Sequence, residues 1–125
     1  MFSDPIMLSF FMWTFITACL WHFFTDFCLQ NEWMANNKHN VKHLAGYVHA
    51  LIITVPMFLC FAWWIPPIIG ITHFIIDTRI PIKWWMSVMR KNLPNEPWYH
   101  PAAITVDQIW HIVVLFCMVY LNWAV

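Results

Sequence analysis

The sequence predicts an all-α integral membrane protein, built as an up-and-down bundle of four transmembrane helices in a single domain over residues 1–125. Two observations predict this class. The chain is 62% hydrophobic and 10% charged, whereas ordinary soluble domains carry about 25% charged residues. Its apolar residues also fall into four runs that polar or proline-containing connectors separate. At this length the chain holds one domain at most.

The first two helices are expected in the N-terminal half. The first runs over about Pro5–Gln30, long enough for a span that needs about 20 residues. Asp4 before Pro5 is a suitable N-cap. A polar connector over 31–40 follows, and the second helix covers about Val41–Trp63, with a kink at Pro56.

The second half begins with a sharp corner at residues 64–67, because two consecutive prolines do not continue a helix. The third helix, about Ile68–Ile80, is short for a full crossing. A short amphipathic segment over Ile82–Asn92 mixes tryptophans with basic residues, a pattern typical of a segment that lies in the membrane interface. The fourth helix covers about Ala102–Trp123.

The basic residues set the expected orientation. All six lie on the same side of the predicted bundle: Lys38, Lys42, Arg79, Lys83, Arg90 and Lys91. The positive-inside rule makes that side cytoplasmic. We therefore expect a multi-pass protein of the bacterial inner membrane with both termini outside. The net charge of zero and the lack of a basic binding motif give no support for a nucleic-acid partner.

Three histidine–aspartate pairs stand in the apolar runs at a spacing of four residues: His22 with Asp26, His73 with Asp77, and Asp107 with His111. One helical turn puts both members of a pair on the same face. With 7 His and 4 Asp among 125 residues, chance predicts about half of one such pair at this one-turn spacing. Ionisable groups in membrane helices are costly and usually mark a functional site.

These pairs and His49 are expected at one depth, about 5 to 14 Å from the cytoplasmic helix ends at the usual rise per residue. A four-helix bundle then brings seven candidate metal ligands together in its core: His22, Asp26, His49, His73, Asp77, Asp107 and His111. Seven ligands suffice for one or two divalent ions. Zinc is favoured, and Mn or Fe is also compatible with nitrogen and oxygen ligands. The alternative is that each pair forms a hydrogen bond within its own helix.

Other polar residues have two interpretations each. Asp26 and Asp107 are candidate proton carriers in catalysis. Gln30, Lys38 and Arg79 are candidate contacts to an anionic substrate, although a glutamine at a helix end and basic residues near lipid headgroups also occur without such a role. Further polar residues are expected outside the ligand set: Gln108 as a hydrogen-bonding neighbour, His43 at the interface, and His39 and His100 in loops.

The ordered motifs resemble a known family. They are His22-Phe-Phe-Thr-Asp26 with Gln30, Trp33-Met-Ala with Lys38, then His49, Thr72-His73 with Asp77, and Asp107-Gln108 with His111. This set resembles the small bacterial and phage membrane proteins of domain of unknown function 3307, and is less closely similar to integral membrane metal-dependent hydrolases. The resemblance implies the helical fold and the site, but no assigned reaction. A lysine is expected soon after the third-motif aspartate, and here Arg79 and then Lys83 follow Asp77.

Three functions follow as hypotheses. The leading one is a membrane-embedded metal-dependent hydrolase that acts at the cytoplasmic leaflet on a lipid-linked or surface phosphoester, ester or amide. The alternatives are a divalent cation or proton transporter, and a non-catalytic phage or bacterial membrane factor with a structural metal. Transport needs polar groups through both leaflets, and the predicted outer half carries no carboxylate or imidazole. Membrane lipid is the expected partner, and the broad apolar faces of so small a bundle favour a homodimer.

Overall fold

The computed structural model describes residues 3–125, and all regular elements there are helical. In chain order these are α1 (Pro5–Phe24), the π-helix η1 (Thr25–Leu29), α2 (Glu32–Asn37), α3 (Leu44–Met57), α4 (Ile65–Asp77), α5 (Ile80–Val88) and α6 (Tyr99–Ala124). The predicted all-α class is confirmed.

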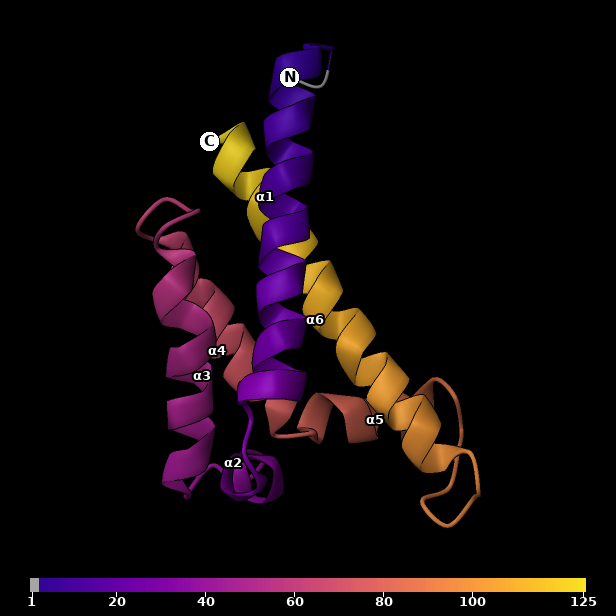
Figure 1. Cartoon of the computed structure of the whole chain (residues 1–125). Coiled ribbons are helices and arrows are strands. Elements are labelled where there is room, and N and C mark those ends of the chain that lie inside the picture. Colours follow the sequence, from indigo (N-terminus) through magenta and orange to yellow (C-terminus); the bar gives the residue numbers. More distant parts are fainter. Residues whose placement is uncertain (1–2) are drawn as a thin grey trace.

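The helices alternate in direction around a common core (Figure 1). α1 descends from the N-terminus, α3 and α4 form an antiparallel hairpin beside it, and α6 returns obliquely to the end at which the chain starts. Contacts join α3 to α4, α4 to α6, α6 to α1, and α1 to α3. The short helices α2 and α5 lie at the opposite end of the molecule from both termini. The four longer helices therefore enclose one core.

The first helix follows the prediction closely. Asp4 caps it by accepting a hydrogen bond from the Ile6 amide, and Pro5 stands in its first turn. The helix continues through η1 to Leu29, and Gln30 leaves it in an extended conformation. The one unforeseen feature is the change to π-helical geometry over its last five residues.

The prediction of four full membrane spans is not supported. Among the described residues, two helices are long and apolar enough to cross a membrane, Pro5–Leu29 and Tyr99–Ala124. α3 and α4 have 14 and 13 residues, which span about 21 and 20 Å at the usual helical rise. A bilayer core is about 30 Å thick. The hairpin is therefore too short for two separate crossings.

The prolines explain where the predicted boundaries of the hairpin were wrong. The second helix does not continue to Trp63: it ends at Met57, directly after Pro56, whose ring crowds the preceding turn. α4 begins at Ile65 rather than Ile68, because its two prolines stand in the first turn, where a missing amide hydrogen costs nothing.

The predicted polar connector and interfacial segment both contain short helices. α2 lies within 31–40, and Asn31 caps it by accepting a hydrogen bond from the Met34 amide. The expected segment Ile82–Asn92 is α5, shifted slightly toward the N-terminus. It buries Ile82 and Met86 and exposes Trp84 and Val88. An amphipathic helix at this place in the chain is thus confirmed.

Two apolar clusters hold the elements together. One fills the half of the bundle nearer the termini and includes Phe11, Ile53, Ile69 and Leu115. The other packs α5 against α4 and α6 through buried Ile76, Ile82, Met86 and Val106. The residues predicted to bind metal lie between these two clusters.

Candidate metal centre

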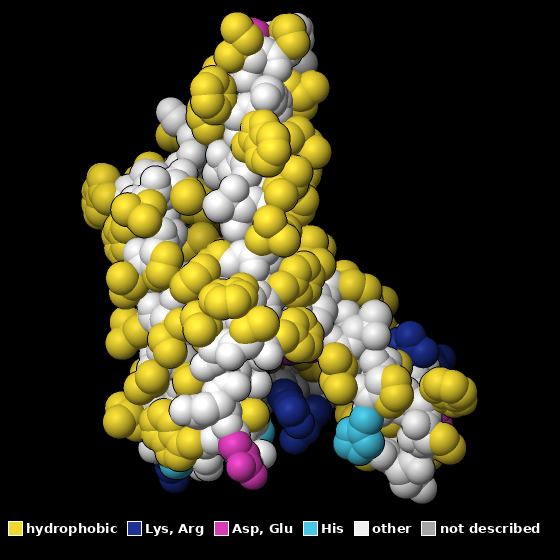
Figure 2. Space-filling model, in the orientation of Figure 1, with side chains coloured by type: hydrophobic (Ala, Val, Ile, Leu, Met, Phe, Trp, Pro, Cys, Tyr) yellow, Lys and Arg dark blue, Asp and Glu magenta, His cyan; other side chains and the backbone are white. Residues whose placement is uncertain are grey.

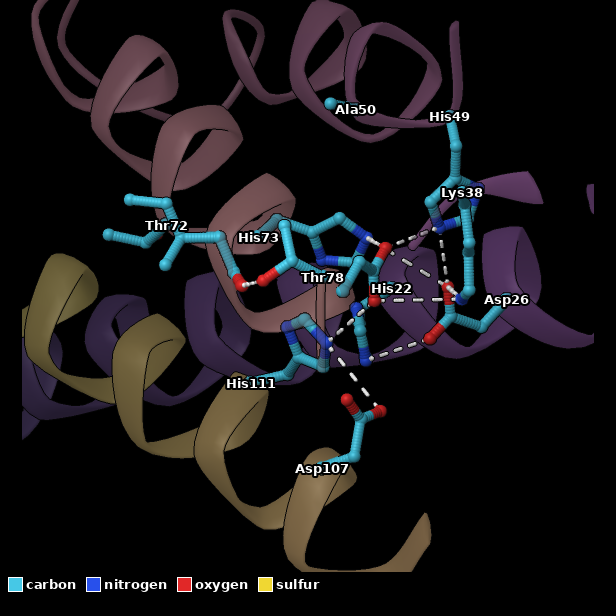
Figure 3. A network of polar contacts seen from close by, with 12 residues as sticks. His22, Asp26, Lys38, His49, Ala50, Thr72, His73, Thr78, Asp107 and His111 are labelled. Atoms are coloured by element: carbon cyan, nitrogen blue, oxygen red, sulfur yellow. Dashed lines mark hydrogen bonds and ion pairs between the residues drawn. The ribbon is translucent and has the colours of Figure 1, made fainter. Parts of the chain in front are cut away.

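All seven predicted ligands converge in the core, and Figure 3 labels six of them: His22, Asp26, His49, His73, Asp107 and His111. α1 and η1 supply His22 and Asp26, α3 supplies His49, α4 supplies His73 and Asp77, and α6 supplies Asp107 and His111. Six of them are buried, and Asp107 is half-buried. The antiparallel arrangement explains the convergence. Two pairs lie near the C-terminal ends of their helices and the third lies in the N-terminal half of α6, which runs in the opposite direction.

Asp26 owes its position to the π-helix. It is the second residue of η1, and both Thr25 and Asp26 are buried there. π-helical turns are rare and occur frequently at functional sites, because the extra residue in the turn changes the direction of side chains. The turn places the Asp26 carboxylate within reach of α3, 2.9 Å from His49 Nε2, as well as 3.5 Å from His22 on its own helix.

One group of ligand atoms is compact. Asp77 Oδ2 lies 3.0 Å from His73 Nε2 and 3.3 Å from His49 Nε2, and Asp26 Oδ1 lies 2.9 Å from the same His49 nitrogen. A tetrahedral zinc ion with bonds of about 2.0–2.1 Å separates its ligand atoms by about 3.3 Å. Three of the contacts within this group are therefore close to that separation, and His73 Nε2 lies somewhat farther, 4.0 Å, from Asp26 Oδ1.

Three atoms of this group contact neighbouring ligand atoms closely but make no hydrogen bond of regular geometry among the described residues. They are Asp26 Oδ1, His49 Nε2 and His73 Nε2, and all three are buried. Their ligand atoms also lie within 4.8 Å of one another. Buried polar atoms are nearly always satisfied, and three such atoms turned toward one another form a set that could hold one common ligand. A divalent cation is the group that would satisfy all three at once.

A second group lies on the other side of Asp77. Its Oδ1 atom is 3.3 Å from His111 Nε2, which is also 3.7 Å from Asp107 Oδ2. Asp77, Asp107 and His111 thus form another set with metal-binding geometry. Because the two oxygens of Asp77 face different groups, its carboxylate is placed to bridge two ions, as in two-metal sites with ions about 3.5–4 Å apart.

His22 joins the second group through its contacts with Gln108 and His111. Its Nε2 lies 3.1 Å from Gln108 Oε1, and its ring stands 4.7 Å from that of His111, centroid to centroid. The Gln108 amide nitrogen donates to Asp107 Oδ2 at 3.1 Å and to Asp26 Oδ2 at 3.4 Å. Gln108 therefore has the hydrogen-bonding role expected of it, and it fixes the orientation of two carboxylates.

Lys38 is part of the site rather than a lipid-facing residue. Its Nζ lies 3.6 Å from Asp77 Oδ1 and 3.9 Å from Asp26 Oδ1. The residue is the C-cap of α2, and its carbonyl approaches α3 at Gly46. A Cβ atom at Gly46 would lie 2.7 Å from the Lys38 carbonyl oxygen. The glycine thus allows the close approach that brings the ammonium group to the carboxylates.

A cleft of about 340 Å³ opens onto the carboxylates at the end of the molecule opposite the termini. Asp26, Asp77 and Asp107 line it together with Gln108. Figure 2 shows Lys and Arg side chains in the notch between the lower ends of α1 and α6. A small molecule could therefore reach the aspartates from the surface of the protein through this cleft.

The other residues singled out from the sequence take varied places. Gln30 and Arg79 line the cleft, as expected of substrate contacts, and Gln30 Oε1 is buried without a hydrogen-bond partner in the described chain. His43 caps α3 by accepting from the Ala45 amide. His39 lies in a turn. His100 is not in a loop as predicted: it stands in the first turn of α6 and lines the cleft.

Sequence reasoning gave no role to Lys83, which it noted only as a basic residue after Asp77, or to Tyr99, and both line the cleft. Their one signal is position, because both follow proline-containing or polar connectors at the basic end of the chain. Arg79 adopts a left-handed backbone with φ 64°, a conformation that residues other than glycine seldom occupy. That conformation makes the sharp turn from α4 into α5.

The motifs that form this centre agree with a family assignment. The family model described as "Protein of unknown function (DUF3307)" matches residues 14–125. The chain belongs to this family. The span matched by the DUF3307 model includes all seven candidate ligands and every residue of the cleft. No curated protein and no solved structure matches the chain.

Proposed function

We propose that this DUF3307 protein is a membrane-embedded, metal-dependent hydrolase. The observation that carries the proposal is the convergence of three buried ligand atoms, Asp26 Oδ1, His49 Nε2 and His73 Nε2, within 4.8 Å of one another. One or two divalent ions, with zinc favoured, would bind there and at the Asp77–Asp107–His111 set.

The cleft favours a catalytic over a structural metal. A structural zinc site is closed, whereas a catalytic one keeps a position for water or substrate. Here the carboxylate side of the site faces the cleft. A bound ion would lower the pKa of a coordinated water and polarise the bond to be cleaved. Asp107, with a side chain 20% exposed, is the better placed of the two aspartates to carry a proton to the leaving group.

The side of the site that faces the termini is closed by apolar residues, and this argues against transport. A void of about 10 Å³ adjoins His22, His73 and His111, and apolar residues such as Ile53 and Leu115 line the rest of it. The apolar cluster beyond it continues toward the termini. Ions that cross a membrane need polar groups along their path, so a one-sided site suits a reaction better than a passage.

A membrane location is supported by the surfaces of the two long helices. Only 17% of the apolar window of Pro5–Leu29 is buried, and 22% of that of Tyr99–Ala124. Large hydrophobic side chains cover most of the surface shown in Figure 2, a pattern that water-soluble monomers seldom show. The Lys and Arg side chains visible there lie in the lower half. That end would face the cytoplasm, with both termini outside and the cleft at the inner leaflet.

Metal analysis of purified variants tests the proposal. The wild-type protein should contain one or two equivalents of a divalent metal, and His73→Ala and Asp77→Ala should lose most of it. The matched control is His39→Ala, which removes an imidazole outside the site and should keep its metal. Chelation should lower the unfolding temperature of the wild type, because a ligand that binds the folded state stabilises it. Normal metal content in His73→Ala and Asp77→Ala would refute the site.

A further inference from the structure

The cleft contains a second set of charged groups beside the carboxylates of the candidate metal centre. Arg79, at the junction of α4 and α5, and Lys83, on α5, line it together with Gln30 and Phe27. Both basic residues are exposed. No hydrogen bond or ion pair within residues 3–125 engages either side chain, whereas Lys38 below them is paired with two carboxylates. Two cations are thus free to bind a ligand.

The charges of the cleft favour an anionic ligand with more than one negative charge. Its three cations, Lys38, Arg79 and Lys83, balance its three carboxylates. Each divalent ion bound at the carboxylates would then leave two positive charges in excess, and such a cleft concentrates anions. Burial lowers the pKa of nearby His39, and the positive charges of Arg79, Lys38 and Lys83 act in the same direction. The positive charges of Arg79, Lys38 and Lys83 are therefore close enough to act on the same side chain.

The two unpaired basic residues favour one of the three substrate classes of the proposed hydrolase over the other two. A neutral ester or amide has no group for Arg79 and Lys83 to neutralise. A phosphomonoester carries about two negative charges at neutral pH and has three oxygens for a guanidinium and an ammonium to bind while another contacts metal. Apolar residues Phe27, Ile82 and Ile104 line the same cleft, which suits a ligand attached to hydrocarbon.

We infer that the cleft binds the phosphomonoester group of a lipid, with Arg79 and Lys83 on its oxygens and the candidate metal ligands beneath it. The inference rests on the proposed hydrolase. In the reaction, the oxygen of a water molecule forms a new bond to phosphorus and the bond from phosphorus to the lipid oxygen breaks. One proton of that water passes to the lipid oxygen, so the products are an alcohol and inorganic phosphate.

Phosphate binding by the metal-loaded protein tests the inference apart from the hydrolase. Arg79→Gln and Lys83→Gln should keep the wild-type metal content but bind inorganic phosphate about tenfold or more weakly, since each loses a charged hydrogen bond. The matched controls are Arg90→Gln and Lys42→Gln, two exposed basic residues outside the cleft, which should bind phosphate normally. Equal affinity in all four variants would overturn the inference. Wild-type protein without metal would instead refute the hydrolase.

Two substrates distinguish the source of the phosphate group. The first is phosphatidic acid in phosphatidylcholine vesicles, and the second is soluble p-nitrophenyl phosphate. The wild type should release phosphate from the vesicles, and Arg79→Gln should do so more slowly, with an increased KM. Faster turnover of the soluble compound would overturn the lipid assignment. Metal-loaded protein that hydrolyses a neutral lipid ester but neither phosphate compound would overturn the inference and leave the hydrolase standing.

Discussion

At the scale of single residues, the centre depends on side chains that have little freedom. The rings of His22, His49, His73 and His111 stack or tilt against one another, with His73 and His111 centroids 4.3 Å apart. Their helices fix the backbone, and each ring is buried. The candidate ligands are therefore held in place by the fold itself, which would reduce the cost of ordering them around an ion.

Gly46 controls the position of Lys38. A Cβ atom there would lie 2.7 Å from the Lys38 carbonyl oxygen and 3.0 Å from Phe74 Cε2. The Lys38 backbone cannot move away as easily as the end of a flexible side chain. We expect Gly46→Ala to reduce the free energy of unfolding by about 1–3 kcal/mol, although alanine favours helix more than glycine. Thermal unfolding in detergent measures this effect. An unchanged or higher unfolding temperature would contradict the close approach.

The sequence predicted single residues well where the information is local. The spacing of the His22, His73 and Asp107 pairs needs one helical turn and nothing else, and all three pairs reach the site. Lys38, Lys83 and Gln108 depend on how α2, α5 and α6 pack, and no local pattern reveals that packing. Lys38 is therefore predicted from the sequence as a contact to an anionic substrate or a lipid headgroup, whereas in the structure it pairs with two carboxylates.

At the scale of the elements, the α3–α4 hairpin carries three of the four residues of the compact ligand group. His49 and His73 stand on its two helices, which approach closely where Gly70 meets Thr54. Small residues allow such close packing of membrane helices. This close contact is therefore one of those that set the separation of the two imidazoles.

A pair of substitutions tests the contact. Gly70→Ala would place its Cβ against Thr54 Oγ1, so it should push the helices apart, destabilise the protein by about 1–3 kcal/mol and weaken metal binding. Thr54→Ala removes the obstructing hydroxyl and should restore much of both properties in the double variant. A double-mutant cycle on unfolding and metal affinity measures this coupling. Additive effects would show that the two residues do not obstruct each other.

The boundaries of the elements were harder to predict than their existence. Each helical segment coincides at least partly with an expected helix or with a connector, but the extent of the hairpin differs from the predicted one. Proline explains this: Pro56 ends α3 one residue later, whereas Pro66 and Pro67 begin α4. The same residue type thus stops a helix or starts one according to its position in the first or last turn. The π-helical geometry of η1 has no comparable signal in the sequence.

At the scale of the whole molecule, the proposed orientation follows from the separation of charge from apolar surface. Residue labelling tests it in a background without Cys19, Cys28, Cys60 and Cys117. A membrane-impermeant maleimide should label Ser3→Cys in intact cells, because that end is expected outside. It should label Asn95→Cys, in the connector before α6, only after the membrane is permeabilised. The reverse pattern would contradict the orientation, and equal labelling of both in intact cells would contradict a membrane location between them.

The short hairpin has a consequence for the surrounding lipids. α1 and α6 extend well beyond the connector between α3 and α4 (Figure 1), where Asn122 Oδ1 accepts a hydrogen bond from the Ala62 amide at 2.8 Å. In a bilayer, acyl chains above that connector would have to tilt inward to cover it, so the outer leaflet would be depressed on one flank of the protein. Such local deformation costs free energy that grows with the mismatch. Two copies that share the depression would relieve part of that cost, which gives lipid elasticity a role in bringing them together.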